Sequence, residues 1–544
     1  MENITITFPD GSKKEFQKNT TYYEIVSGYH HDYDILAVEI NHQVISLHSK
    51  ATQNETIGLI DVRSLAGSKI YQAGLKFMFL NAVSELYEDA EVRFLHSVPR
   101  GILSEVYMTH NLTSDDVSKI KQVMSSYVEK KMPFLTYNMD VKEAHRYYKK
   151  MKEEEKAGIA DSLPIKVVSM YRLGNRLNYF YSNMPHDTVV LKQFELVFIG
   201  KNRIVLVSPS ISSGGKLPEY VHYENIVENF MESKKWLRRM DVPYLSTLNS
   251  LVSHSQIQDF MDSNELLYER DLMRAAEHII SMRDVRMVLI AGPSSSGKTT
   301  TMKRLSDILR SQGYDPVGLS TDDFFVDRID TPKDENGQYD FECLQAIDLE
   351  LFNTTLKKLL KGEKTEVPEY DFVSGKKIYK DKKIQLTENS ILLVEGLHCL
   401  NDELIPFIDS KYKFKIYLSP FMPLSIDRHN YISTLDLRLI RRMVRDHRTR
   451  GKSVDDTIRE WSSVRSGEEK YIFPYVYQAD MIINTALAYE VGVLKVYALP
   501  LLLSVGVESL YYSEARRLVD YLQGFFTIPG EYVREVSVLK EFIG

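Results

Sequence analysis

The sequence predicts an α/β fold whose main sheet is parallel, with smaller α+β modules ahead of it in the chain. The apolar run 287–291 leads directly into a glycine-bounded loop and then into residues 300–310, which have the apolar spacing of an amphipathic helix. A second apolar run, 390–394, is typical of a strand buried on both faces of a parallel sheet. Near the N-terminus, apolar and polar residues alternate around a Pro-Asp-Gly turn, which predicts short strands of another kind.

The loop after the first of these strands reads GPSSSGKT, from Gly292 to Thr299. A strand, such a loop and a helix N-terminus in this order form the phosphate cradle of a P-loop, and this context argues against an ordinary Gly/Ser-rich turn. Backbone N–H groups converge there on phosphate oxygens, and the helix dipole adds positive potential. We expect Lys298 to reach the terminal phosphates of ATP and the Thr299 hydroxyl to bind Mg²⁺. The residues expected to bind the nucleotide are Gly292, Pro293, Ser294, Ser295, Ser296, Gly297, Lys298, Thr299 and Thr300.

Residues 314–320 predict a further strand, expected beside the phosphate-loop strand, and the acid pair Asp322-Asp323 follows it. Ligands of open α/β sheets bind at the carboxyl ends of the strands, so a carboxylate here can accept the proton of an acceptor hydroxyl. We expect Asp322 to be this catalytic group, and Asp323 to cap the turn or to contact Mg²⁺-bound water. The alternative is that both aspartates only cap the turn, as Asp commonly does.

Glu395 ends the apolar run 390–394 and precedes a glycine, which is the form of an acid delivered to a Mg²⁺–phosphate site. No Asn-Lys-x-Asp base reader of the GTPase kind follows, which favours a kinase. Further on, arginines recur at helical spacing and share one helix face. Guanidinium groups bind phosphate oxygens, so we expect this helix to close as a lid over the phosphates, the alternative being a solvated basic helix. These arginines are Arg438, Arg441, Arg442, Arg445, Arg448 and Arg450.

Length and composition indicate a globular protein of several domains, with 544 residues, 43% of them apolar and 26% charged. The net charge of −7 argues against a whole-protein electrostatic footprint for nucleic acid. Two cysteines, and an N-terminus without a basic and apolar leader, predict a cytoplasmic protein. The most apolar stretch, 491–507, is interrupted by Lys495 and Pro500, so we expect a buried helix followed by a break and no membrane contact.

Residues 1–63 predict a hairpin around Pro9-Asp10-Gly11, then a helix and further strands. This order, together with the stretch Val38-Glu-Ile-Asn41, resembles a TGS domain, the small β-grasp module at the front of threonyl-tRNA synthetases. TGS modules are linked to RNA or nucleotide ligands. A plain scaffold or oligomerisation module is the alternative.

The helical run 71–86 and the stretch 170–194 dominate residues 64–210. They resemble the second additional domain that follows TGS in threonyl-tRNA synthetases, an α+β unit with a metal-type editing site of three histidines and a cysteine. The residues aligned with that site are Tyr71, Leu75, Ser182 and His186. One histidine cannot hold a Zn²⁺ ion that needs three or four protein ligands, so we expect the synthetase-like fold without its editing chemistry.

The C-terminal half carries several motifs in order: GPSSSGKTT, Ser320-Thr-Asp322, Pro368-Glu-Tyr370-Asp-Phe372, Glu395-Gly396 and the arginine helix. This order resembles the uridine kinase and phosphoribulokinase branch of P-loop kinases. The resemblance implies a P-loop NTPase kinase domain over 285–500, with Asp322 as the base and with Thr299 and Glu395 at Mg²⁺. It also implies arginines that clamp phosphates and aromatic residues that border the nucleoside. These residues are Arg441, Arg442, Arg445, Arg450, Tyr370 and Phe372.

Three positions depart from the uridine–cytidine kinase pattern. The ribose-binding aspartate aligns with Glu342, the base-contacting histidine with Gly375 and a lid arginine with Lys452. Losing a hydrogen-bonding group can move specificity outright. The residues expected at the substrate are Asp322, Glu342, Tyr370, Phe372, Arg442 and Arg445, and those expected in catalysis are Asp322, Lys298, Arg442 and Arg445.

We therefore predict an ATP- and Mg²⁺-dependent kinase that phosphorylates the 5′-hydroxyl of a ribonucleoside such as uridine or cytidine. The alternatives are a kinase of another small alcohol, such as a sugar phosphate, and an ATP-binding RNA-associated or nucleotide-sensing protein. Residues 211–284 predict a helical connector and residues 501–544 a helical extension. The basic run 234–239 of the connector contacts RNA or, more usually for such runs, solvates a helix face. Assembly into a homo-oligomer stays open.

Overall fold

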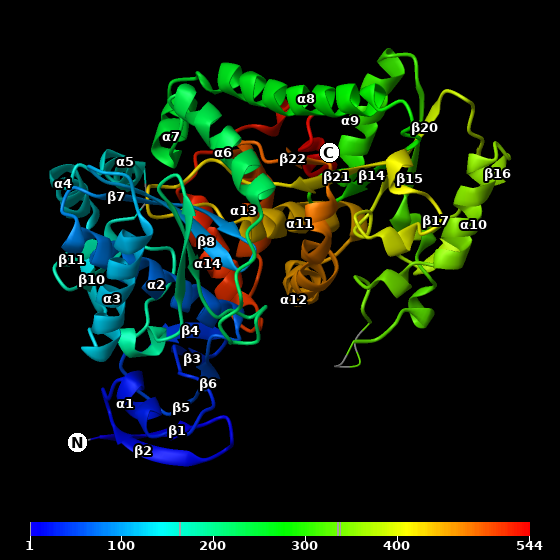
Figure 1. Ribbon diagram of the computed structural model, residues 1–544. Coiled ribbons are helices and arrows are strands. Elements are labelled where there is room, and N and C mark those ends of the chain that lie inside the picture. Colours follow the sequence, from blue (N-terminus) through cyan, green and yellow to red (C-terminus); the bar gives the residue numbers. More distant parts are fainter. Residues whose placement is uncertain (1, 163–164, 335–336, 338) are drawn as a thin grey trace.

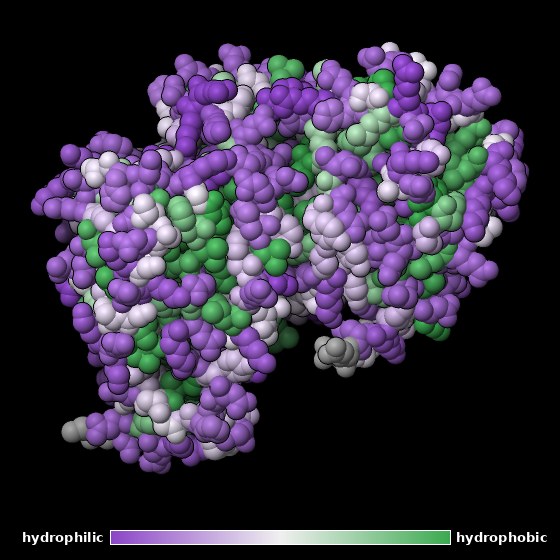
Figure 2. Space-filling model, viewed as in Figure 1, coloured by the Kyte–Doolittle hydropathy of each residue, from purple (hydrophilic) through white to green (hydrophobic). Residues whose placement is uncertain are grey.

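The computed structural model describes residues 2–162, 165–334, 337 and 339–544. Figure 1 shows the N-terminal strands at one end of the molecule and the strands of the parallel sheet toward the other, with long helices along one side. The face seen in Figure 2 is mostly hydrophilic, with hydrophobic residues in short patches. None of the described helices has both the length and the apolar character needed to span a bilayer.

The main sheet has the strand order β15-β20-β14-β21-β22, and all neighbouring pairs are parallel. Its strands are β14 (Met287–Ala291), β15 (Asp315–Ser320), β20 (Ser390–Glu395), β21 (Lys413–Ser419) and β22 (Met481–Asn484). The predicted parallel sheet is thus confirmed. The expectation that the strand ending at Ser320 lies beside β14 is wrong, because β20 lies between them. Every residue of β20 is buried, as expected for a strand in the interior of a parallel sheet.

Side chains of β14 alternate between two hydrophobic cores, one on each face of the sheet. Val288 and Ile290 enter the first core, and Met287 and Leu289 enter the second. The helices that pack on the first core are α7 (Leu245–Ser253), α8 (Ile257–Ser281), α9 (Lys298–Ser311), α11 (Thr434–Arg450), α12 (Val454–Tyr471), α13 (Glu490–Leu503), α14 (Tyr512–Gln523) and α15 (Lys540–Ile543). The second core is covered by α6 (Glu224–Arg239) and α10 (Leu349–Leu360).

Helix α11, the predicted lid, packs its apolar face into the first core. Leu437, Ile440 and Met443 on this helix are buried in the first core. The apolar stretch 491–507 forms α13, which runs through Pro500 and ends at Leu503.

The first strands form two small sheets, with orders β2-β1-β5 and β4-β3-β6. Ile4, Ile6 and Phe8 are buried beneath them, and Gly11 turns the first hairpin with a φ of +81°, which few L-residues adopt. Thr21 caps the following helix through a reciprocal bond with Glu24. The elements are β1 (Asn3–Thr7), β2 (Lys13–Gln17), α1 (Tyr22–Ser27), β3 (Ala37–Ile40), β4 (Gln43–Ser46), β5 (Glu55–Thr56) and β6 (Gly58–Ile60).

The next unit contains the sheets β12-β13-β8-β7 and β11-β10-β9, with the long helix α2 buried in its core. Tyr71 of α2 is buried and its hydroxyl donates to the carbonyl of Gln193 at 2.8 Å, while His186 stacks on the ring of Tyr23. The elements are α2 (Leu65–Leu86), β7 (Glu91–Val98), β8 (Gly101–Tyr107), α3 (Ser114–Glu129), β9 (Leu135–Asp140), α4 (Val141–Lys150), α5 (Glu154–Ser162), β10 (Val167–Leu173), β11 (Arg176–Asn178), β12 (Glu195–Gly200) and β13 (Arg203–Val207).

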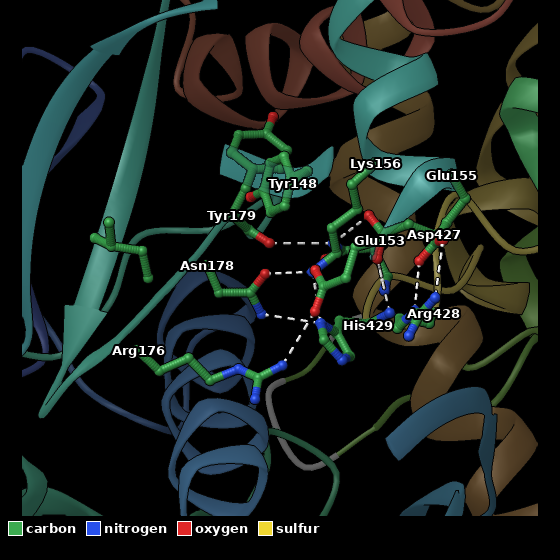
Figure 3. A network of polar contacts seen from close by, with 12 residues as sticks. Tyr148, Glu153, Glu155, Lys156, Arg176, Asn178, Tyr179, Asp427, Arg428 and His429 are labelled. Carbon is green, nitrogen blue, oxygen red and sulfur yellow. Dashed lines mark hydrogen bonds and ion pairs between the residues drawn. The ribbon is translucent and has the colours of Figure 1, made fainter. Parts of the chain in front are cut away.

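A buried polar network joins this unit to the segment 427–430, which precedes α11 (Figure 3). Arg428 donates to the carboxylate of Glu155 at 2.6 and 3.1 Å. The ammonium group of Lys156 contacts the ring nitrogen of His429 and pairs with Glu153 at 3.0 Å. Because these partners are buried, the two parts of the chain are held in one fixed arrangement.

Candidate active site

The loop from Gly292 to Gly297 joins the end of β14 to the start of α9. Gly297 has a φ of +88°, and a Cβ there would meet Val538 at 2.5 Å. A Cβ at Gly292 would lie 2.6 Å from the Ser296 hydroxyl. The glycines therefore allow a tight turn that no side chain fits. The first N–H groups of α9 have no partner within the helix and suit an anion, although that of Thr300 is bonded to Glu541.

Lys298 and Thr299 form the first turn of α9, next to Glu395 at the end of β20. The Thr299 hydroxyl donates to Glu395 Oε1 at 3.2 Å, and the Ser320 hydroxyl donates to the same oxygen at 2.9 Å. Strand pairing explains this meeting, since Ser320 and Glu395 are register partners at the carboxyl ends of β15 and β20. The Lys298 ammonium donates to the carbonyl of Pro293 at 3.4 Å. Ser320 is a contributor that the sequence motifs did not predict.

Glu395 is buried, and burial raises the pKa of its carboxyl to about 7, although the charge of Lys298 acts against the rise. The negative charge of Asp322 adds to it, so both acids belong to one electrostatic cluster. A buried carboxylate beside a hydroxyl offers the oxygen ligands that Mg²⁺ prefers, and Mg²⁺ in kinases takes few protein ligands plus phosphates and water. Glu395 and Thr299 therefore fit a Mg²⁺–nucleotide.

Asp322 and Asp323 lie in the short 3₁₀ turn η2 (Thr321–Phe324) at the end of β15. Ser320 begins the turn by accepting the N–H of Asp322 at 3.4 Å. Asp323 accepts the backbone N–H of Tyr370 at 3.4 Å, a role that the sequence did not predict. Asp322 is half-buried and stands close enough to Glu342 for its charge to raise the pKa of that residue.

The predicted acceptor side is built on the hairpin β17 (Glu369–Asp371) and β18 (Lys376–Ile378), which follows the short strand β16 (Thr365–Glu366) and precedes β19 (Lys383–Ile384). Tyr370 is buried, and its ring centroid lies 5.3 Å from that of Phe372, which is 39% exposed. Gly375 has a φ of +71°, and a Cβ there would lie 2.9 Å from Arg328. The turn itself therefore disfavours a histidine at this position.

Glu342 faces the same region from the segment before α10. Burial raises the pKa of its carboxyl to about 7, while the charge of Arg442 acts against the rise. Helix α12 approaches it closely, because a Cβ on Gly467 would lie 2.4 Å from the Cβ of Glu342.

Two arginines of α11 brace the phosphate loop from behind. The Arg441 side chain is fully buried, pairs with Glu490 at 2.6 Å and donates to the carbonyl of Ser295 at 3.3 Å. Arg438 pairs with Glu468 and donates to the carbonyl of Ser294 at 2.9 Å. Because Arg438 and Arg441 are buried and already paired, their hydrogen bonds fix the conformation of the phosphate loop. The predicted role of Arg441 as a phosphate ligand does not fit this placement.

Three further arginines of the helix gather around the buried carboxylate of Asp446, whereas Arg448 donates to the carbonyl of Glu541 at 3.4 Å. Arg445 lies 2.8 Å from it and Arg442 and Arg450 lie 3.3 and 3.6 Å away. Burial raises the pKa of the Asp446 carboxyl, but the charges of these three arginines outweigh burial and lower it. Arg442 also donates to the Ser294 hydroxyl at 3.1 Å, and Arg450 lies over the Phe372 ring at 4.6 Å. Arg442, Arg445 and Arg450 thus connect the phosphate loop with the predicted acceptor side.

The C-terminal segment lies against the first turn of α9, which the sequence did not predict. The Glu541 carboxylate accepts the Thr300 N–H at 3.2 Å and the Thr300 hydroxyl at 2.8 Å. The Phe542 ring lies 4.9 Å from the Arg441 guanidinium group. A carboxylate therefore takes one of the N–H groups that a phosphate oxygen would use.

Comparisons with known proteins find a family match for the part of the chain that contains the phosphate loop. Residues 287–491 match the Phosphoribulokinase / Uridine kinase family. A "Uridine kinase" of Staphylococcus aureus (strain JH9) is 30% identical over 203 residues, which are 37% of this chain and 88% of that protein. A "Uridine kinase" of Halobacterium salinarum is 27% identical over 196 residues, 36% of this chain and 77% of that protein.

A solved structure described as "Structure of a Possible Uridine Kinase from Bacillus stearothermophilus" is 25% identical, with a TM-score of 0.24, and the match covers 27% of this chain and 79% of that one. Residues 1–286 lie outside the segment that matches the family. The resemblances of the front units to synthetase domains therefore stay predictions. Through residues 287–491, the chain belongs to the phosphoribulokinase and uridine kinase family.

Proposed function

We propose that this protein transfers the γ-phosphoryl group of ATP to the 5′-hydroxyl of a ribonucleoside, with uridine and cytidine as the first acceptors to test. One observation carries the proposal: the carboxyl ends of β14, β20 and β15 bring the phosphate loop, Glu395 and Asp322 to one edge of the sheet. Ligands of open α/β sheets bind at this edge. The relatives named uridine kinase support the same class of reaction.

The proposed roles follow from the positions of the side chains. Lys298 and the N–H groups of α9 hold the phosphates, and Asp322 orients the acceptor hydroxyl and accepts its proton. Arg442 and Arg445 stabilise negative charge on the phosphoryl group as it moves. When bound, Mg²⁺ neutralises phosphate charge and would be held by Thr299 and Glu395.

The acceptor would lie between Asp322 and the β17–β18 hairpin. Tyr370 and Phe372 supply aromatic faces for a base, and Glu342 supplies a carboxylate for ribose hydroxyls. Because Gly375 has no side chain, selection among bases falls to the aromatic pair and to backbone groups of the hairpin.

The test is an acceptor screen with purified protein, Mg²⁺ and ATP, in which nucleoside monophosphates and sugar phosphates are separated by chromatography. We expect product from a pyrimidine ribonucleoside, and a loss of turnover of about a thousandfold or more in Asp322→Asn with ATP affinity nearly unchanged. Asp315→Asn is the matched control, because Asp315 lies at the opposite end of the same strand.

Unchanged turnover in Asp322→Asn would contradict the assignment of this residue. Product from a sugar phosphate alone would identify another small alcohol as the acceptor. Binding of ATP without product from any acceptor, together with salt-sensitive binding of tRNA, would favour an RNA-associated sensing protein.

A further inference from the structure

A second cavity system lies between α2, α12 and α14. It consists of a cavity of about 240 Å³ and an adjoining one of about 770 Å³, which share wall residues that include Lys69, Tyr181, Trp461 and Arg465. The larger of these volumes is typical of sites for small molecules. The positions aligned with the synthetase editing histidines on α2, Tyr71 and Leu75, are not part of either wall.

Part of the charge in these walls is already neutralised. Lys69 lies 3.2 Å from Asp436 and 3.0 Å from Glu514, and Arg517 lies 2.8 Å from each of the same carboxylates. This four-residue cluster joins α2, α11 and α14 and gives the cavity a fixed, neutral floor.

Arg438 of the smaller cavity is likewise paired, with Glu468, but three further cations of its wall have no such partner. Among the described residues, no carboxylate lies within ion-pair distance of Lys76, Arg100 or Arg465, although Glu469 of the same wall attracts Arg100 and Arg465 at longer range. Positive charge is therefore in excess. Burial lowers the pKa of Lys76 to about 8 and also lowers the pKa of Arg465. A bound anion would offset the cost of holding these cations away from water.

Aromatic rings stand beside two cations of this wall, Phe180 beside Lys76 and Trp461 beside Arg438. The Lys76 ammonium group lies 5.2 Å from the Phe180 ring centroid, and Trp461, whose side chain lines both cavities, is only 3% exposed. A flat apolar surface next to cations suits a ligand that carries both a planar ring and an anionic group.

We infer that the two adjoining cavities together bind a small organic anion with a planar ring, about the size of a nucleoside monophosphate, through Lys76, Arg465 and Trp461. The smaller cavity also reaches the back of the phosphate loop, because Pro293 lies in its wall and Arg438, also in the wall, donates to the carbonyl of Ser294. The site is separate from the proposed acceptor side, whose residues Asp322, Tyr370 and Phe372 are absent from both walls.

The chain's two tryptophans allow a direct test. In Trp236→Phe, Trp461 becomes the reporter, and its fluorescence is followed while UMP or AMP is added, with uridine and inorganic phosphate as separate probes. We expect a saturable change with a monophosphate, and binding at least tenfold weaker for uridine, which lacks the anion. Arg465→Met and Lys76→Met should each weaken monophosphate binding about tenfold or more.

Matched controls separate charge at the cavity from charge elsewhere. Arg465→Lys keeps the cation and should bind within about threefold of the parent, and Arg239→Met removes an exposed cation outside the walls and should change nothing. If Arg465→Met does not fold, Lys76→Met decides, because Lys76 lies on a different helix. Monophosphate binding that survives both substitutions belongs to the proposed kinase site and overturns the inference, as does the absence of any saturable binding by fluorescence and calorimetry.

Discussion

Glu395 and Arg441 are buried charged residues in opposite circumstances. Arg441 has a full carboxylate partner in Glu490, whereas the side-chain hydrogen bonds that Glu395 receives from the described residues come from hydroxyl groups. Burying a charged group without a partner costs free energy, and an oppositely charged partner offsets part of that cost. Arg441 is therefore arranged for stability, and Glu395 has the placement expected for its proposed role at Mg²⁺.

For Glu395→Gln we expect a more stable ligand-free protein at alkaline pH and weaker Mg²⁺-dependent ATP binding. Between the ordinary pKa of a glutamate, 4.5, and about 7, the folded protein keeps a proton on Glu395 that the unfolded chain releases. The free energy of unfolding contributed by this group therefore falls as pH rises through that window. Urea unfolding at pH 8 should show a gain of roughly 1–3 kcal/mol, and at pH 4.5 almost none. Equal gains at both pH values would contradict the raised pKa.

Arg441→Ala should lower the free energy of unfolding by roughly 3–5 kcal/mol, because Glu490 is left charged and buried. Adding Glu490→Gln should restore part of the loss.

Arg445→Ala should cost less than about 1 kcal/mol, since Asp446 keeps Arg442 and Arg450, but should reduce turnover clearly. Denaturant curves and initial rates check both; the assignment fails if the two variants are equally unstable.

At the scale of elements, the first turn of α9 is shared between the phosphate loop and the C-terminal segment. The Thr300 N–H is bonded to Glu541, and the Gly297 turn is packed by Val538. Residues 538–542 therefore take part of the surface that a nucleotide would contact.

Glu541→Gln should bind ATP roughly threefold to tenfold more tightly, because the competing negative charge at the helix N-terminus is removed. Glu535→Gln is the matched control, since Glu535 lies in the same segment with a side chain that is 90% exposed. Calorimetric titration with an ATP analogue measures the change. Weaker binding in Glu541→Gln would instead assign this carboxylate a direct contact with the nucleotide.

Local patterns allowed the elements around the loop to be predicted, because 287–301 and 390–395 each carry their own periodicity and turn residues. Long-range partners could not be predicted in this way. The insertion of β20 between β14 and β15 depends on pairing over long separations, and helical spacing alone cannot show that Arg441 faces Glu490. The contact of Glu541 with Thr300 spans 241 residues and has no sequence signal.

At the scale of the whole molecule, the network of Figure 3 links the front units to the family domain through direct polar contacts. Glu153, Glu155 and Lys156 come from one side, and Arg428 and His429 from the other. Helix α14 adds a second link, because Glu514 pairs with Lys69 of α2.

Arg428→Ala should therefore destabilise both parts together, by roughly 2–4 kcal/mol, because Glu155 loses its partner in a buried setting. Hydrogen exchange should rise in α5 and in segment 427–430 to a similar extent. Arg459→Ala, which breaks an exposed pair with Asp456, is the control and should change neither. Faster exchange on one side only would show that the parts open independently.

The same network limits which substitutions and which chimeras the protein can accept. In the pair of Arg428 with Glu155 and in the contact of Lys156 with His429, one residue lies before residue 180 and the other after residue 426, so a substitution on one side changes which residues are acceptable on the other. A chimera that combines this catalytic half with a foreign front half must import complementary acids opposite Arg428. The front half therefore constrains the sequence of the half that carries the phosphate loop.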